Sequence, residues 1–214
     1  MITLGLIDDH VITRKGIKTV LELQEDIQVI LEAKNGEELL QILKDAPQLP
    51  SVLILDINMP TMNGISTIDA VKELYPSIQI LIFTLLDEED AVINMITRGA
   101  SGYLPKSADP AILVLAVRQI VECGFYLGLL VKKEYFRRQL DPKRKQGFYG
   151  KEFLSSRELE YIKLAATNLT YSEIAKNMDV RPKTLENYRD SVFLKLGINN
   201  TPALAIYALK NGLL

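Results

Sequence analysis

Short apolar runs alternate with segments of helical periodicity over residues 1–125. Runs with strand character occupy residues 3–8, 28–33, 52–56, 79–84 and 102–104. The runs at 52–55 and 80–83 are continuously apolar, which is typical of parallel strands covered by helices on both faces. A helical segment over residues 110–124 closes the repeat. The pattern predicts an α/β domain built on a doubly wound, five-stranded parallel sheet.

The pattern changes after residue 153, where only helical stretches remain. Hydroxyl caps at Ser155 and Ser156 start one helix that ends near Thr167, and Thr170 starts a short helix that reaches Met178. After a tight turn, Pro182 opens a longer helix that reaches residue 196. We predict a small all-α domain that contains two helices joined by a tight turn.

Charge divides the chain in the same place. Residues 1–131 carry a net charge of −9, residues 132–146 carry +5 and residues 147–214 carry +2. We therefore expect three parts: a first domain over 1–125, a basic and partly helical linker over 126–150, and a helical domain over 151–214. A polyanionic partner is expected at the C-terminal part.

Composition excludes several kinds of site. With one histidine, His10, and one cysteine, Cys123, the chain cannot form a multi-histidine metal site, an internal disulfide or a thiolate cluster. We interpret Cys123 as an interior residue and His10 as a loop residue. No apolar run approaches the roughly 18 residues that span a bilayer, and the N-terminus shows no secretory leader. We expect a cytoplasmic protein without a membrane partner.

Polar side chains stand where the predicted strands end. Asp8 and Asp9 end the first strand, and the other strand ends carry Asp56, Thr84 and Lys106. The carboxyl ends of adjacent parallel strands meet at one edge of the sheet, so these side chains are expected to lie together. Three crowded carboxylates repel one another unless a cation joins them, and oxygen ligands select Mg²⁺ or Mn²⁺. Singly, each aspartate could instead serve a turn or cap a helix.

A carboxylate can accept a phosphoryl group when a metal ion and a lysine neutralise the developing charge. Asp56 is suited to be the phosphoryl acceptor, and Lys106 is suited to be the lysine that neutralises the charge. Thr84 is placed to donate its hydroxyl to a phosphate oxygen, which would give a neighbouring loop a reason to move.

The motifs Leu6-Ile7-Asp8-Asp9-His10, Leu55-Asp56-Ile57-Asn58-Met59-Pro60 and Gly102-Tyr103-Leu104-Pro105-Lys106 resemble the receiver domain of bacterial response regulators, which has a flavodoxin-like fold. The resemblance covers residues 1–125. It implies that Asp9 and Asp56 bind the metal directly, Asp8 through water and Asn58 through its backbone carbonyl. It also implies that Tyr103 is an aromatic residue whose rotation follows Thr84.

One position departs from that family. The residue after the switch threonine is usually small, whereas this chain has Leu85 followed by Leu86. Bulk at this position could restrict the access of water to the acyl phosphate and lengthen its lifetime. An unchanged half-life in Leu85→Ala would contradict this hypothesis.

The helical domain resembles the LuxR-type helix-turn-helix over residues 152–214, and the whole chain therefore resembles the NarL/FixJ-type response regulators. The longer helix has an inward stripe of Leu185, Tyr188, Val192 and Leu196. We expect the DNA contacts to come from Lys183, Thr184, Glu186, Asn187, Arg189, Asp190 and Lys195. Glu186 could accept from cytosine and Asn187 could pair with adenine, while the acidic side chains should lower non-specific affinity for phosphates.

The sequence thus predicts a transcriptional regulator that a sensor histidine kinase phosphorylates on Asp56 and that then binds double-stranded DNA as a dimer. It predicts no turnover enzyme, although slow self-dephosphorylation is compatible with the site. Two alternatives remain. A phosphatase or phosphotransferase could use an aspartyl phosphate, but the segment 56–58 lacks the second acid that such hydrolases use. A receiver with a helical tail that recruits only protein is the other.

Overall fold

The computed structural model describes residues 1–85, 89–126, 154–167 and 169–214. The chain divides into two compact units, Met1–Tyr126 and Leu127–Leu214, and each is described here by itself. Apart from Tyr126, the predicted basic linker lies outside the described residues.

The first unit is built on a parallel five-stranded sheet of the order β2-β1-β3-β4-β5. The strands are β1 (Ile2–Ile7), β2 (Ile27–Ala33), β3 (Val52–Leu55), β4 (Gln79–Thr84) and β5 (Gly102–Pro105). Every residue of β3 is buried, as its continuously apolar sequence predicts for a strand with both faces covered. The strand order places β1 and β3 side by side at the switch point, where ligands bind in sheets of this kind.

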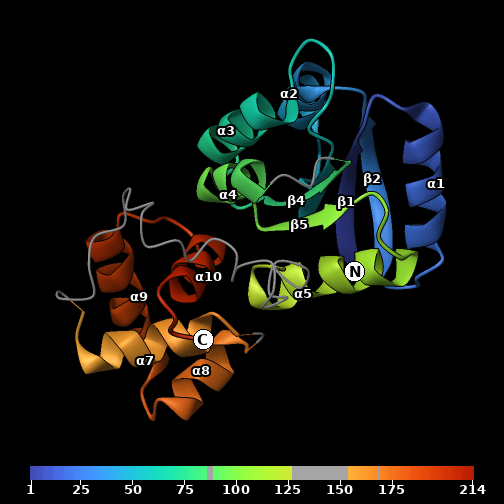
Figure 1. Cartoon of the computed structure of the whole chain (residues 1–214). Coiled ribbons are helices and arrows are strands. Elements are labelled where there is room, and N and C mark those ends of the chain that lie inside the picture. The colour runs from blue at the N-terminus through green and yellow to red at the C-terminus, as the bar shows by residue number, and fades with distance from the viewer. Residues whose placement is uncertain (86–88, 127–153, 168) are drawn as a thin grey trace. The chain divides into compact units, whose positions relative to one another are not determined.

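Five helices cover this sheet: α1 (Val11–Glu22), α2 (Gly36–Asp45), α3 (Gly64–Leu74), α4 (Glu89–Thr97) and α5 (Pro110–Cys123). Figure 1 shows α2, α3 and α4 on one side of the sheet and α1 and α5 on the other. Asn35, Asn63 and Asp109 accept hydrogen bonds from the first turns of α2, α3 and α5, so each of these helices begins at a side-chain cap. The fold class predicted from the sequence is confirmed.

The second unit consists of α7 (Ser156–Ala165), α8 (Tyr171–Asn177), α9 (Pro182–Leu196) and α10 (Thr201–Lys210) in its described part. Both α7 and α8 begin with a capping box, formed by Ser155 with Glu158 and by Thr170 with Glu173. Gly197 ends α9 in a left-handed conformation, with φ of 64°. The predicted helical pair joined by a tight turn is therefore α8 and α9.

Several predicted ends were wrong by a few residues. Asp8 and Asp56 lie just after β1 and β3, because the paired register ends at Ile7 and Leu55. Helix α5 ends one residue early, since Gly124 has a φ of 84°. Helix α7 ends at Ala165 rather than near Thr167, whose N–H already closes a tighter turn to Leu164.

Cys123 is only partly buried, not an interior residue, because it occupies the last turn of α5.

Within the described residues, no single helix is both long and apolar enough to cross a membrane. Only α9 and α10 taken together, bent by 64°, meet the length and composition of a span.

Candidate functional site

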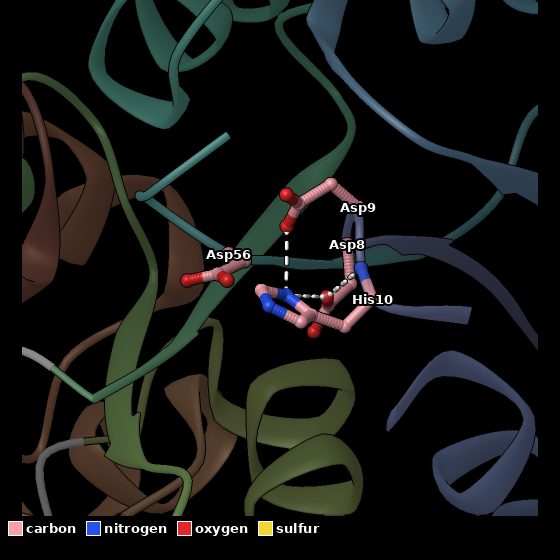
Figure 2. Close-up of side chains that lie close together, drawn as sticks. All are labelled: Asp8, Asp9, His10 and Asp56. Carbon is pink, nitrogen blue, oxygen red and sulfur yellow. Dashed lines mark hydrogen bonds and ion pairs between the residues drawn. The ribbon is translucent and has the colours of Figure 1, made fainter. Parts of the chain in front are cut away.

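Three aspartates meet where β1 and β3 end. Asp8 and Asp9 follow β1, and Asp56 follows the neighbouring β3. Asp8 and Asp56 are buried, and Asp9 is partly buried. Ligand atoms of these three aspartates and of His10 all lie within 4.8 Å of one another, and Figure 2 shows them gathered around one spot. The predicted acidic cluster is therefore present in the structure.

Lys106 supplies a positive charge to this cluster from the end of β5. Its Nζ lies 2.6 Å from Asp56 Oδ2 and 2.7 Å from Asp8 Oδ2. Burial alone would lower the pKa of Lys106, but the contacts of its ammonium with the Asp56 and Asp8 carboxylates outweigh burial and raise that pKa. The lysine therefore stays charged between two carboxylates.

Backbone groups fix the other oxygen of Asp56. Ile57 N–H donates to Asp56 Oδ1 at 2.7 Å, and Asn58 N–H donates to the same oxygen at 3.4 Å. Gly64 permits this tight loop, since an added Cβ would lie 2.6 Å from the Asp56 carbonyl oxygen. Asn58 contacts Asp56 through its backbone N–H. Metal binding by the Asn58 carbonyl stays a prediction.

The two predicted switch residues lie on the strands beside Asp56. Thr84 ends β4 and is fully buried, and its carbonyl oxygen accepts a hydrogen bond from Lys106 N–H at 2.9 Å. Tyr103 lies in β5 and is also buried. Leu85 follows Thr84 and is 76% exposed. The response of Thr84 and Tyr103 to phosphate, and the shielding by Leu85, stay predictions.

Sequence reasoning missed two neighbours of the cluster. His10, taken as a plain loop residue, donates its N–H to Asp8 Oδ1 at 2.8 Å, and its Nδ1 lies 2.9 Å from Asp9 Oδ1. Its place directly after two aspartates was the available signal. Arg14 donates to the carbonyl oxygen of Asp8 at 2.6 Å. No pattern in the sequence marked Arg14.

The donor set fits a hard divalent cation. Asp8 Oδ2 and Asp9 Oδ1 are buried and accept no well-aligned hydrogen bond within the described residues, although Lys106 and His10 lie within ion-pair distance. Buried carboxylate oxygens with open acceptor positions are the ligands that Mg²⁺ and Mn²⁺ prefer. The three aspartates could therefore hold such an ion.

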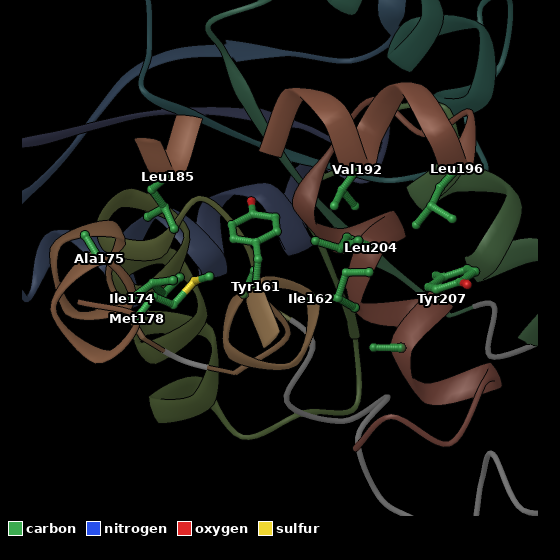
Figure 3. Packing of buried hydrophobic residues seen from close by; sticks show 12 residues of the cluster. Tyr161, Ile162, Ile174, Ala175, Met178, Leu185, Val192, Leu196, Leu204 and Tyr207 are labelled. Carbon is green, nitrogen blue, oxygen red and sulfur yellow. The ribbon is translucent and has the colours of Figure 1, made fainter. Parts of the chain in front are cut away.

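A second candidate site is the exposed face of α9. Figure 3 shows Leu185, Val192 and Leu196 projecting from α9 into the apolar cluster of the second unit. Lys183, Asn187 and Asp190 are exposed, and Glu186 is partly buried. The acidic residues pair with cations of the same helix: Glu186 Oε2 lies 2.8 Å from Lys183 Nζ, and Asp190 Oδ1 lies 2.9 Å from Arg189 Nη2. Thr184 is partly buried on the first turn of α9.

Lys195 differs from Lys183 and Arg189, because its ammonium binds a carboxylate on another helix, α7. Its Nζ lies 2.7 and 2.8 Å from the two carboxylate oxygens of Glu158, which also accepts from Ser191 at 2.6 Å. Burial alone would raise the pKa of Glu158, but hydrogen bonds from Lys195, Ser191 and Ser155 lower that pKa to about 2. Glu158 was not predicted in this role; its only visible signal was the capping box.

Two family profiles match the chain. "Response regulator receiver domain" matches residues 4–118, and "Bacterial regulatory proteins, luxR family" matches residues 152–208.

Similar proteins align over nearly the whole chain. The oxygen regulatory protein NreC of Staphylococcus epidermidis is 34% identical over 213 residues, which cover 97% of this chain and 96% of NreC. The transcriptional regulatory protein DegU of Brevibacillus brevis is 28% identical and covers 99% of this chain and 94% of DegU. The structure of RcsB from Salmonella enterica serovar Typhimurium, bound to promoter rprA with the phosphomimetic BeF3-, aligns with a TM-score of 0.55 and 25% identity, over 99% of this chain and 100% of RcsB. The chain therefore belongs to the NarL/FixJ-type response regulators, transcription regulators that join a receiver domain to a LuxR-type domain.

Proposed function

We propose that Asp56 accepts a phosphoryl group from a sensor histidine kinase and that the modified chain binds double-stranded DNA through α9. The observation that carries the first step is the position of Lys106 Nζ, 2.6 Å from Asp56 Oδ2, in a cluster of three aspartates of which Asp8 and Asp56 are buried. A fixed ammonium beside a carboxylate nucleophile is what charge neutralisation in phosphoryl transfer requires.

In the proposed transfer, a carboxylate oxygen of Asp56 attacks the phosphorus of the kinase phosphohistidine. The P–N bond breaks, its electron pair leaves with the imidazole, which takes up a proton, and an acyl phosphate forms. Mg²⁺ or Mn²⁺ would be held directly by Asp9, Asp56 and the Asn58 carbonyl, and through water by Asp8. The ion, when bound, would neutralise charge on the phosphoryl oxygens. Lys106 is placed to bind one of those oxygens.

Thr84 and Tyr103 are the proposed route by which the phosphate alters the rest of the chain. Thr84 is joined to Lys106 through its carbonyl oxygen, so a movement of the threonine is transmitted to the start of the loop after β5. Each chain takes one phosphate and acts as a switch, with self-dephosphorylation as the only hydrolytic step.

For DNA binding, we propose base contacts from Glu186, Asn187 and Asp190 and phosphate contacts from Lys183, Thr184, Arg189 and Lys195. The exposure of Asn187, Asp190 and Lys183 supports their contacts, while Glu186 is partly buried. Lys195 would have to exchange Glu158 for a phosphate, so its contact is the weakest of the set. A solved RcsB structure is described as two dimers bound to two parallel DNAs. We propose a homodimer on DNA here too, formed upon phosphorylation.

We also propose the division into a receiver domain over 1–125, a basic linker over 126–150 and a DNA-binding domain over 151–214, in a chain that resides in the cytoplasm.

Labelling of the full chain with acetyl phosphate and Mg²⁺ tests the phosphoacceptor. We expect one phosphoryl group per chain by intact mass, and none in Asp56→Asn. The matched control is Asp45→Asn, which removes an exposed carboxylate of the same domain and should be labelled like the original chain. Equal labelling of Asp56→Asn, or no labelling of the folded original chain by either acetyl phosphate or a cognate kinase, would falsify the proposal.

A further inference from the structure

The side chain of Arg14 on α1 joins three elements next to the acidic cluster. Its Nη1 donates to the carbonyl oxygen of Asp8 at 2.6 Å, and its Nε donates to Glu32 Oε2, on β2, at 3.1 Å. The side chain is only 16% exposed. Arg14 therefore contacts the backbone of the cluster, and within the described residues its side chain has no hydrogen bond or ion pair to the carboxylates of the three aspartates.

Glu32 determines the direction in which the guanidinium points. A guanidinium is planar and its N–H groups have fixed directions, so binding one edge to Glu32 orients the remaining donors. Lys18, one turn further along α1, binds the other oxygen of Glu32 at 3.0 Å. Hydrogen bonds from Lys18 and Arg14 hold the pKa of Glu32 below its ordinary value against the effect of burial. Glu32 thus stays a charged anchor.

The carbonyl that Arg14 holds lies where the chain leaves β1. This peptide group links Asp8 to Asp9, so its rotation determines where both carboxylates point. Two further bonds fix the same turn: His10 N–H donates to Asp8 Oδ1 at 2.8 Å, and Arg14 N–H donates to the His10 carbonyl at 3.0 Å. From outside the turn, the Arg14 side chain holds the Asp8 carbonyl and the Ala33 carbonyl of β2 accepts from Asp8 N–H at 3.2 Å.

We infer that Arg14, held by Glu32, is a positioning residue that aims Asp8 and Asp9 at a divalent cation. The inference rests on the proposed metal site. The positive charge of Arg14 opposes a cation, whereas the fixed peptide favours one, because ligand groups must converge before the ion binds. If Arg14 acts by positioning, its loss should weaken cation binding; if it acts only by its charge, its loss should strengthen cation binding.

Two substitutions in the full chain separate positioning from charge. Arg14→Gln removes a positive charge near the site and Glu32→Gln removes a negative one, so a purely electrostatic effect would shift cation affinity in opposite directions. Positioning predicts that both weaken Mn²⁺ binding, measured by electron paramagnetic resonance of the free ion, by about tenfold. The half-saturating Mg²⁺ for labelling by acetyl phosphate should rise similarly, while the labelling rate at saturating Mg²⁺ changes less.

Lys18→Gln is the matched control. It makes the same charge change as Arg14→Gln and also removes a partner of Glu32, but Lys18 has no bond to Asp8 in the structure. We expect near-normal Mn²⁺ affinity for this variant. Arg14→Lys keeps the positive charge but loses the planar guanidinium that binds Asp8 and Glu32 at once. Its Mn²⁺ affinity should lie between that of Arg14→Gln and that of the original chain. Without metal, hydrogen exchange at residues 8–10 should be faster in Arg14→Gln than in Lys18→Gln.

Opposite shifts in Arg14→Gln and Glu32→Gln, or a loss in Lys18→Gln equal to that in Arg14→Gln, would overturn the inference. A chain that binds Mn²⁺ but is never labelled would contradict the proposed phosphoacceptor and leave the Mn²⁺ comparison to decide on Arg14. An original chain that binds no Mn²⁺ would contradict both.

Discussion

Lys106 lies against two buried carboxylates, Asp56 and Asp8. Its single positive charge cannot neutralise both of them, which determines the net charge of the acidic site without metal. Its Nζ is within 2.7 Å of both Asp56 and Asp8, while Asp9 adds a third negative charge nearby. Buried like charges repel strongly because the interior screens them poorly. The pocket therefore retains an excess of negative charge that a divalent ion can neutralise.

Lys106→Met should destabilise the receiver domain more without Mg²⁺ than with it. Removing one partner of a buried ion pair costs about 3 kcal/mol in the free energy of unfolding, and a bound cation would replace part of the lost charge. Thermal unfolding of the full chain with and without MgCl₂ measures this difference. Lys15→Met, which removes an exposed charge of α1, is the control. An equal effect of Mg²⁺ on Lys106→Met and on the original chain would contradict the argument.

The aspartates of the site could be predicted because the ends of neighbouring parallel strands must meet, whatever the side-chain details. Arg14 could not be predicted in the same way. Its contact with Asp8 depends on how far α1 is rotated and on the register of β2, which brings Glu32 opposite Leu6. A periodic pattern predicts which face of a helix is apolar. It does not predict which groups are contacted by the polar end of a long side chain at the edge of that face.

At the scale of elements, Glu158 joins α7 to α9. It caps its own helix through Ser155 N–H and binds Ser191 and Lys195 across the interface. Lys195 was expected to contact DNA. The sequence did not show that a buried glutamate lies opposite it, since capping-box glutamates are usually exposed, like Glu173.

The low pKa of Glu158 predicts an acid-sensitive domain. A carboxyl whose pKa is about 2 in the folded chain and 4.5 ordinarily contributes stability above pH 4.5 and loses it as the pH falls toward 2. The contribution is on the order of 3 kcal/mol. Thermal unfolding followed by circular dichroism between pH 6 and pH 2.5 should show that Glu158→Gln is less stable at the upper end and that its deficit shrinks with acid. Glu160→Gln, which changes a partly exposed neighbour, should follow the original chain.

The ion pairs along α9 predict weak binding to DNA of arbitrary sequence. Lys183 and Arg189 already have carboxylate partners, so a phosphate must compete with Glu186 and Asp190. Glu186→Gln and Asp190→Asn should each raise affinity for a mixed-sequence duplex and steepen its salt dependence by about one unit of slope. Fluorescence anisotropy at several salt concentrations measures both. Glu160→Gln makes the same charge change on another helix; if it strengthens binding equally, net charge and not α9 is responsible.

At the scale of the whole molecule, the two units have separate cores, and the family pairs a phosphate-responsive domain with a regulatory one. The sequence could predict both units because each has its own periodicity and its own caps. In the proposed switch, phosphate changes an equilibrium of the full chain. Moving such an equilibrium from 1:99 to 99:1 requires about 5.5 kcal/mol of preferential stabilisation.

Beryllofluoride with Mg²⁺ should therefore increase both dimerisation and DNA affinity of the full chain, because it places a phosphate-like charge on Asp56 beside Lys106 and Thr84. Sedimentation velocity measures the dimer, and anisotropy with a duplex selected from a random pool measures the affinity. Asp56→Asn should respond in neither assay, whereas Asp45→Asn should respond like the original chain. If Asp56→Asn gains DNA affinity with beryllofluoride to the same extent, the signal does not pass through this carboxylate. If the original chain dimerises without gaining affinity for DNA, the receiver controls only dimerisation, and DNA binding by α9 is regulated in another way.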